Sequence, residues 1–283
     1  MGSSNDAVKV NGDLVLNGTI TLVSNGGTVN SSTRLFTYTG SFIGTPTLVA
    51  PTGYVATLDT TLPGVLRVKL SAMLPFSETF EDTPAGMAYV PGLVDGQRGW
   101  QAAQANCATV QTSRAYAGQK AVALTDGTVS HSLTGVVATN VWFDIVIQPQ
   151  MNPDDELLPL EQNSSVAMYV NSAGKIVVQS GSAWRTCDAF TAASNEWLRL
   201  TVKLNYAARK WELYAAHAEQ GSKALRVARD LDFVAGSTNG AVREFRLTSD
   251  NGKTAYLDDL SVTDAAVSGR PGHVDFGTRL LIK

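Results

Sequence analysis

The stretch WLRLTVKLNYAARKWELYAA, residues 197–216, decides the fold of the longer part of this chain. Its first eight residues alternate between apolar and polar side chains. Strict alternation is the pattern of a half-buried β-strand. One face carries Leu198, Leu200, Val202 and Leu204, and the other carries Trp197, Arg199, Thr201 and Lys203. The segment therefore predicts a strand with one apolar face.

The second half of the stretch allows two interpretations. Leu204, Ala208, Trp211, Ala215 and Ala218 have the spacing of a helical stripe. Alternatively, NYAARK at 205–210 forms a turn, and Trp211, Leu213 and Ala215 lie in a second strand. We favour the hairpin, because a strand of this kind needs a partner.

Several other short alternating segments flank this hairpin, among them VWFDIVIQP (141–149), VNSAGKIVV (170–178) and AYLDDLSVT (255–263). Many short strands separated by polar turns indicate a two-sheet sandwich. The composition agrees, because charged residues make up 17% of the chain, against roughly 25% in typical soluble domains. The net charge of −3 gives no general attraction to nucleic acid or to anionic membranes, and no stretch has the length of a membrane span.

The N-terminal segment VKVNGDLVLNGTITLVSNGGTV, residues 8–29, contains Asn-Gly at 11–12, 17–18 and 25–26. Asn-Gly is a strong signal for a sharp turn. A spacing of six to eight residues suits one coil of a β-solenoid as well as it suits a β-meander. We predict three regions: a small β unit at 1–72, a sandwich at 73–264, and a linker with a strand-like tail at 265–283.

The first region resembles the autotransporter-associated β-strand repeats of large secreted bacterial proteins, on GDLVLNGTITL (12–22) and on residues 38–70. The second resembles the concanavalin A-like jelly roll, in its laminin-G-like and carbohydrate-binding-module branch. That resemblance rests on ETFED (78–82), Gly99-Trp100, the 195–214 segment and YLDDLSV (256–262). Together they imply an all-β chain with a jelly-roll sandwich behind a small solenoid-like or meander-like unit.

Alternation places Asp258 on the same face as Leu260 and Val262, so a carboxylate is predicted on the core side. A buried carboxylate needs a cation or several hydrogen-bond donors. The resemblance to carbohydrate-binding jelly rolls implies one structural calcium ion held by acids of the opening and closing strands. The candidate ligands are Glu78, Glu81, Asp82, Asp258 and Asp259. The alternative is that Asp258 accepts hydrogen bonds from backbone amides or an arginine, with no metal.

The sequence argues against catalysis. Jelly-roll glucanases typically carry paired acids on one strand, and that motif is not found here. The acids of NPDDELLPLEQ (152–162) have a loop composition, and no nucleophile motif accompanies the scattered histidines. Two tryptophans, Trp142 and Trp184, are candidates for contact with glycan, because exposed aromatic rings pack on sugar C–H faces.

The tail is the remaining candidate surface. Its apolar residues are expected to pair with a sheet edge, of this chain or of a neighbour. They are Val274, Phe276, Leu280, Leu281 and Ile282. We expect a non-catalytic extracellular or cell-surface protein, with its leader removed or absent. It would be structural or adhesive and self-associating, as a homo-oligomer or fibre. A carbohydrate-binding module that recognises surface polysaccharide is the alternative, and an enzyme that acts on polysaccharide is a remote one. The sequence does not decide whether Cys107 and Cys187 are bonded.

Overall fold

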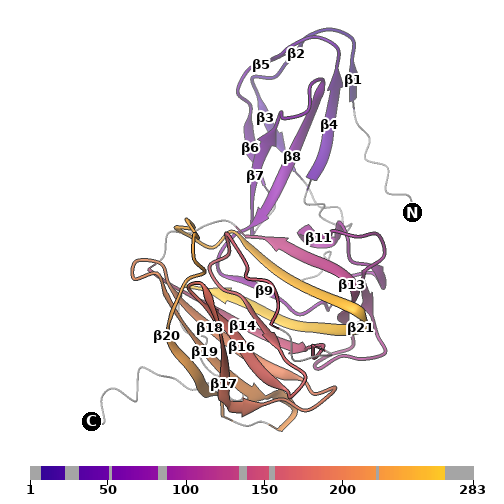
Figure 1. The fold of residues 1–283 in the computed structure, drawn as a ribbon. Coiled ribbons are helices and arrows are strands. Elements are labelled where there is room, and N and C mark those ends of the chain that lie inside the picture. Colours follow the sequence, from indigo (N-terminus) through magenta and orange to yellow (C-terminus); the bar gives the residue numbers. More distant parts are fainter. Residues whose placement is uncertain are drawn as a thin grey trace.

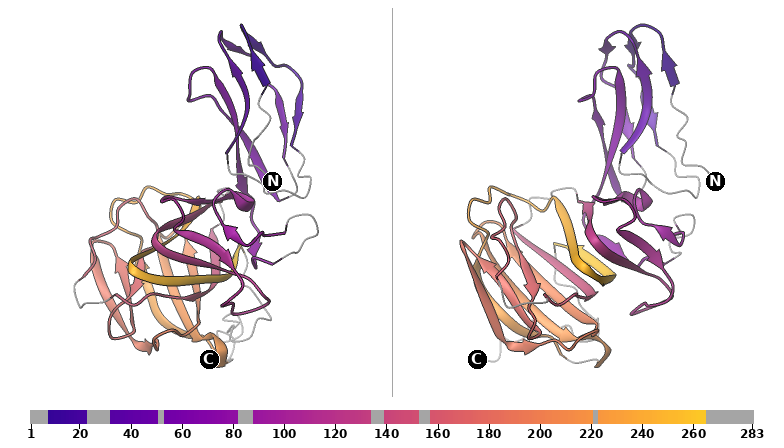
Figure 2. Two further views of the ribbon diagram at one scale, coloured as in Figure 1. Left: turned by 90° about the vertical axis from the view of Figure 1, so that its right-hand side faces the viewer. Right: turned by 45° about the vertical axis from the view of Figure 1, so that its right-hand side comes forward.

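The computed structural model describes residues 8–22, 32–50, 53–81, 88–133, 139–152, 157–220 and 223–264. A narrow N-terminal unit projects from a larger β-sandwich (Figures 1 and 2). The described helices are two 3₁₀ turns, η1 (Gln97–Gly99) and η2 (Ala218–Gln220). None of the described helices has the length and apolarity needed to cross a membrane.

The N-terminal unit consists of two stacked coils followed by a hairpin. The first coil contains β1 (Val8–Val10), β2 (Leu14–Val15) and β3 (Thr19–Thr21). The second contains β4 (Ser32–Tyr38), β5 (Phe42–Ile43) and β6 (Thr47–Val49), and the hairpin is β7 (Tyr54–Asp59) with β8 (Val65–Ala72). Antiparallel β7 and β8 then extend the sheet from β4.

The two coils stack in parallel with one constant offset. Val8 pairs with Phe36, Leu14 with Phe42, and Thr19 with Thr47, so each partner lies 28 residues further along the chain. Parallel pairing of consecutive coils is the arrangement of a β-solenoid, which a meander of antiparallel hairpins lacks. Of the two arrangements left open by the sequence, the coils are therefore solenoid-like.

The sandwich contains the remaining strands. They are β9 (Phe76–Glu78), β10 (Gly92–Leu93), β11 (Trp100–Ala102), β12 (Ala108–Gln111), β13 (Ala121–Ser132), β14 (Asn140–Gln148), β15 (Met168–Val170), β16 (Lys175–Ser180), β17 (Ala183–Thr191), β18 (Leu198–Asn205), β19 (Lys210–His217), β20 (Leu225–Asp232) and β21 (Glu244–Thr263). The large sheet has the order β10-β12-β13-β21-β14-β18-β19-β20, with β9 and β11 paired beside it. The small sheet has the order β15-β16-β17.

The core lies between the two sheets. The predicted apolar face of β18, Leu198 to Leu204 in alternation, is buried in the main hydrophobic cluster. Ile176, Val178 and Cys187 of the small sheet belong to the same cluster. β18 pairs with β19 through a turn at 206–209, so the hairpin is confirmed and the helical interpretation is wrong. The all-β fold, with a jelly-roll sandwich behind a small β unit, is also confirmed.

The closing strand β21 contains a β-bulge that changes the predicted faces. The register against β14 shifts, so that Ile145 pairs with Leu260 while the next residue, Val146, pairs with Asp258. Asp259 is the extra residue, with φ of 35°. Asp258 is fully buried, as predicted, but it lies on the opposite face of the sheet from Leu260. Simple alternation was wrong here, because one inserted residue reverses the faces.

The N-terminal unit and the sandwich share apolar packing. Tyr54, Val68 and Leu70 of the hairpin belong to the main hydrophobic cluster of the sandwich. The Tyr54 hydroxyl also donates a hydrogen bond to the carbonyl of Arg98, at 3.2 Å. Cys107 and Cys187 are both free thiols and both buried.

Candidate functional site

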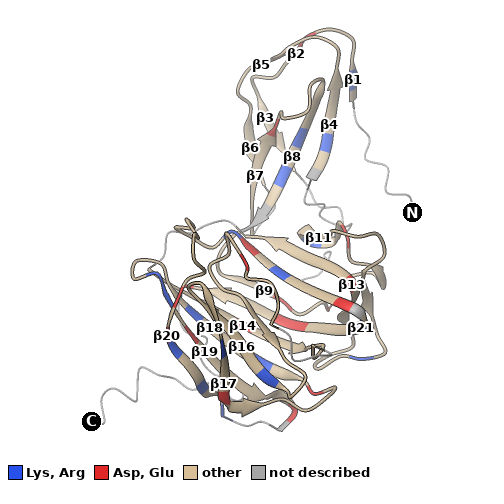
Figure 3. Ribbon diagram, in the orientation of Figure 1, with Lys and Arg blue, Asp and Glu red and all other residues tan. Residues whose placement is uncertain are grey.

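The face of the large sheet that is turned away from the core carries aligned aromatic and charged side chains. The pairing of β14, β18 and β19 places Trp142, Lys203 and Glu212 in one row across the strands. The next row holds Asp144, Thr201 and Tyr214, with Arg226 of β20 beside them. We call these seven residues the outer face. Charged positions of both signs are interspersed over the sandwich strands (Figure 3).

Trp142 and Tyr214 form the aromatic part of the outer face. Their ring centroids are 6.5 Å apart with an interplanar angle of 25°. The Lys203 ammonium lies over the indole, 5.4 Å from its centroid, in cation–π range. Trp142 does point away from the core, as the sequence indicated, but only 7% of it is exposed. The indole is therefore covered by its neighbours, among them Lys203 and Tyr214.

Charged groups around the aromatic pair remain accessible. The side chains of Lys203, Glu212 and Arg226 are 32%, 25% and 46% exposed. Glu212 accepts a hydrogen bond from the Tyr214 hydroxyl and lies within 4 Å of both cations. Burial raises the pKa of Tyr214, and the neighbouring carboxylate of Glu212 raises it further. The phenol therefore stays protonated and serves as a hydrogen-bond donor.

The centre of the outer face is a buried ion pair. Arg199 donates to both carboxylate oxygens of Asp144, at 3.0 and 2.6 Å, and the Thr201 hydroxyl donates to Oδ1 at 2.9 Å. Bidentate pairing of this kind fixes both side chains in one geometry. Asp144 is 0% exposed and Arg199 5%, so this pair lies on the same side of the sheet as Trp142 but is not itself accessible.

Trp184, the second predicted glycan contact, lies on a different surface. It is half-buried on the outer side of the small sheet, and its indole N–H donates to the carbonyl of Leu158 at 2.7 Å. Tyr169 meets it edge-on, with centroids 5.1 Å apart. Leu157 and Leu160, in the loop that crosses this side, are 66% and 45% exposed. This surface is more apolar than the outer face, and Trp184 is not brought near Trp142.

Glu78, the first of the predicted calcium ligands, is satisfied by donors from the protein. It lies 1% exposed in β9 and pairs with Arg98 at 3.1 Å. Glu78 accepts a hydrogen bond from the Tyr89 hydroxyl at 2.7 Å. The hydroxyl oxygen of Tyr89 in turn accepts a hydrogen bond from the Trp100 indole N–H at 2.9 Å. Burial raises the pKa of Glu78, while the Arg98 guanidinium opposes the rise.

Glu81 and Asp258 hold one loop from its two ends. Glu81 accepts hydrogen bonds from the backbone amides of Gln119 and Lys120, both at 2.7 Å. Asp258 accepts hydrogen bonds from the backbone amides of Tyr116 and Ala117, at 2.9 and 3.1 Å. Burial raises the pKa of Asp258 to about 7, and these amides act in the opposite direction. The opening and closing segments are therefore fastened through the 116–120 loop.

This arrangement does not fit the calcium site that the resemblance implies. Calcium needs six to eight oxygen ligands that converge on one point. The carboxylates of Glu78, Glu81 and Asp258 instead face N–H and O–H donors, and one of the donors to Asp258 is the backbone amide of Asp259, the bulged residue, at 2.8 Å. Within the part of the chain that is described, no three His, Cys, Asp or Glu side chains form a group that could hold a metal. Asp82 lies outside the described residues.

The other predicted sites are not covered by the structure. The tail residues Val274, Phe276, Leu280, Leu281 and Ile282 lie outside the described residues. Sequence reasoning missed Lys203, Glu212, Tyr214 and Arg226 as neighbours of Trp142. The alternation of β18 and β19, which contain Lys203, Glu212 and Tyr214, was visible in the sequence, but the order of the strands in the sheet was not, and neither was the place of Arg226 in β20 beside them.

No family model and no curated protein matches the sequence. Among solved structures, a sialidase aligns with a TM-score of 0.44 and 9% identity over 70% of this chain, which spans 20% of that protein. The catalytic domain of a glycoside hydrolase family 131 protein from Coprinopsis cinerea aligns with a TM-score of 0.42 and 11% identity. The alignment covers 67% of this chain and 93% of that domain. The CBM22-1 xylan-binding domain from Paenibacillus barcinonensis aligns with a TM-score of 0.33 and 12% identity. The alignment covers 66% of this chain and 92% of that domain.

Proposed function

We propose that this chain is a non-catalytic carbohydrate-binding protein of the cell exterior, and that it binds glycan on the outer face. The observation that carries the proposal is the row of Trp142, Lys203 and Glu212 beside Tyr214 and Arg226. An aromatic pair surrounded by partly exposed donors and acceptors suits a ligand with apolar C–H faces and many hydroxyl groups. Sugars have both properties.

The role of each side chain follows from its exposure. Lys203, Glu212 and Arg226 supply hydrogen bonds to sugar hydroxyls, because they alone of the outer face keep substantial contact with solvent. Trp142 becomes a stacking surface when the flexible lysine stem swings away. Asp144 and Arg199 join β14 to β18 beside the site and hold the two strands in a fixed geometry. None of these groups is assigned a chemical step.

The test is isothermal titration calorimetry with soluble xylan, mannan, β-1,3-glucan and polygalacturonate. We expect one of them to bind, and the double variant K203A/E212A to weaken that binding at least about tenfold, equivalent to about 1.4 kcal/mol. Lys175→Ala is the matched control, because this lysine lies on the small sheet and donates to Asp188 at 3.1 Å. Trp184→Ala tests the other aromatic surface.

Three results would contradict the proposal. They are no binding of any polysaccharide, binding that survives K203A/E212A but is lost in Trp184→Ala, and release of reducing ends during incubation. The last result would indicate an enzyme.

Self-association is the second candidate function. The observation in its favour is the first solenoid coil, whose outer edge has no strand partner among the described residues. Unpaired edges recruit other strands. The chain would then act as a structural or adhesive subunit, and light scattering across a range of concentrations tests this role independently of glycan.

A further inference from the structure

Lys203 and Arg226 share a single acidic neighbour on the outer face. The Lys203 ammonium lies 3.8 Å from Oε1 of Glu212, and the Arg226 guanidinium lies 3.9 Å from Oε2. Both separations are too long for hydrogen bonds, whereas Oε2 accepts a hydrogen bond from the Tyr214 hydroxyl. Two positive charges therefore flank one negative charge, and this part of the outer face carries an excess of one positive charge.

The other charged groups on this side of the sheet are already satisfied by close partners. Arg199 and Asp144 form the buried bidentate pair. Lys210, two residues before Glu212 in β19, pairs with Asp232 of β20 at 2.6 Å. Asp258 is buried and accepts backbone amides. The whole chain has a net charge of −3, so the positive excess beside Tyr214 is a local property.

The two cations that carry this excess keep donors directed to solvent. The side chain of Arg226 is 46% exposed and that of Lys203 is 32% exposed. A guanidinium has five N–H donors and an ammonium has three. The planar fork of arginine matches the oxygens of a carboxylate or a sulfate and binds them with paired hydrogen bonds. Arg226 is therefore the better placed of the two to hold an anionic group.

We propose that the glycan of the outer face is an anionic polysaccharide, with a uronate carboxylate or a sulfate ester held by Arg226 and a second positive charge supplied by Lys203. This inference rests on the proposed function, because it names the class of glycan. The aromatic pair and the oxygens of Glu212 serve the uncharged part of the sugar. The charge of Glu212 then opposes the ligand, which gives the proposal a test by sign.

Matched ligands test the role of the negative charge. Polygalacturonate and its methyl ester have the same backbone and differ in the charge of the carboxyl group. Isothermal titration calorimetry should give a dissociation constant about tenfold lower or more for the charged polymer. Added salt should reduce this difference, because mobile ions screen the charges. Dextran sulfate and dextran form the second pair. Tighter binding of polygalacturonate would assign a uronate, and tighter binding of dextran sulfate a sulfate ester.

Glu212→Gln is the most diagnostic variant. The glutamine keeps an oxygen that can accept from Tyr214, while the negative charge beside the ligand is removed. The affinity for the anionic polymer should therefore rise about threefold or more, and the affinity for its uncharged counterpart should not change. Arg226→Ala should lower the affinity for the anionic polymer about tenfold, because hydrogen bonds to a charged group are lost.

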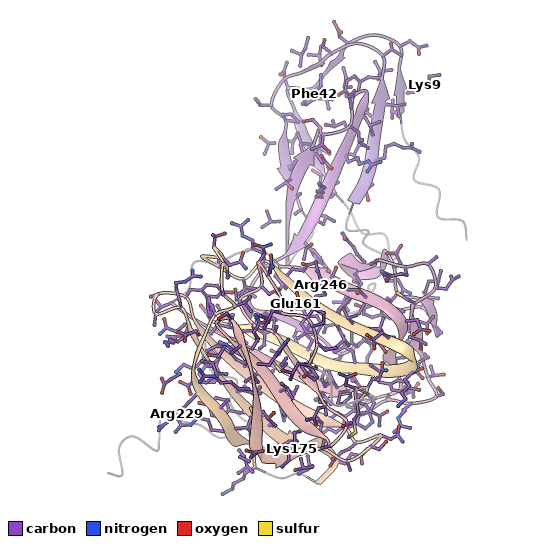
Figure 4. The ribbon with its side chains drawn as sticks, viewed as in Figure 1. Lys9, Phe42, Glu161, Lys175, Arg229 and Arg246 are labelled. Carbon is purple, nitrogen blue, oxygen red and sulfur yellow. The ribbon has the colours of Figure 1, made fainter. Side chains whose placement is uncertain are left out.

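Arg229→Ala is the matched control. Arg229 belongs to the same strand as Arg226, so the two substitutions change the net charge of the protein equally. It is 69% exposed, lies 3.9 Å from its neighbour Asp230, and is found at the margin of the sandwich (Figure 4). This variant should bind like the parent. Far-ultraviolet circular dichroism checks the fold of each variant, and these partly exposed substitutions should leave the spectrum unchanged.

Three results would overturn the proposal. They are equal affinity for the charged and uncharged polymers of both pairs, weaker binding of the anionic polymer by Glu212→Gln, and an effect of Arg229→Ala as large as that of Arg226→Ala. Binding of xylan or mannan alone, weakened by K203A/E212A, would leave the proposed function standing and show that the anionic class is wrong. Binding of no polysaccharide would remove both.

Discussion

At the residue scale, the buried acids show what a sequence pattern can predict. The burial of Asp258 followed from its place within an apolar strand, and so did its need for partners. The identity of those partners did not follow, because the amides of Tyr116 and Ala117 come from more than 140 positions earlier in the chain. Of the two possibilities that the sequence left open, the structure favours amide donors over calcium.

Two buried groups should give this protein opposing pH dependences. Burial raises the pKa of Asp258 to about 7 and lowers that of His131 to about 4. The unfolded values are about 3.9 for Asp and 6.5 for His. The contribution of Asp258 to the free energy of unfolding is therefore complete below about pH 4 and is lost as the pH rises through 7. That of His131 is complete above about pH 6.5 and is lost as the pH falls through 4.

Asp258→Asn should separate the two effects. The amide stays neutral at every pH, so the variant should lose the fall in stability with rising pH that Asp258 causes between about pH 4 and 7, and the contribution of His131, which has the opposite sign, should remain. Each pKa unit corresponds to about 1.4 kcal/mol, so the difference from the parent should reach a few kcal/mol at most. Urea unfolding at pH 5 and pH 7.5 measures it. Identical pH profiles for parent and variant would rule out Asp258 as the titrating group.

At the scale of elements, the sequence identified strands more reliably than their partners. Alternation located β18 and its core face, and the polar turn in VNSAGKIVV located the hairpin of β15 and β16. The bulge at Asp259 and the 28-residue stacking of the coils were not predicted. Both depend on which strand lies alongside, and local spacing carries no such information. Asn-Gly pairs indicated turns, without distinguishing a coil from a meander.

The stacking of the two coils depends on Gly44. Its φ is +113°, and a Cβ added there would lie 2.1 Å from the carbonyl oxygen of Leu16 in the first coil. Gly44→Ala should therefore separate the coils and lower the free energy of unfolding by a few kcal/mol, about 1–3 of which comes from backbone strain. Urea unfolding followed by circular dichroism measures the loss.

Gly12→Ala is the control for this substitution. Its φ of +129° is equally unfavourable for alanine, but nothing lies within 4 Å of the added atom. The difference between the two variants isolates the contact between coils from the strain of the backbone. Equal losses would mean that close approach of the coils at Gly44 contributes nothing.

At the scale of the whole molecule, the N-terminal unit and the sandwich meet through shared apolar packing. Tyr54, Val68 and Leu70 are part of the main hydrophobic cluster, and Arg98 accepts a hydrogen bond from Tyr54. A boundary near residue 72 is visible in the sequence as a change of composition. The continuity of the core across that boundary is not, because it depends on how the hairpin docks.

Shared packing predicts that the two parts unfold together. All five tryptophans lie in the sandwich, the first at position 100, so indole fluorescence reports that part alone, whereas far-ultraviolet circular dichroism reports both. In the parent chain the two signals should change at the same urea concentration, as cooperative unfolding requires. Tyr54→Ala should move them apart, because it removes the ring and the hydroxyl that join the hairpin to Arg98. Tyr54→Phe keeps the ring and should leave the signals close to coincident. Transitions that are already separate in the parent would show that the contact at Tyr54 does not couple the two parts.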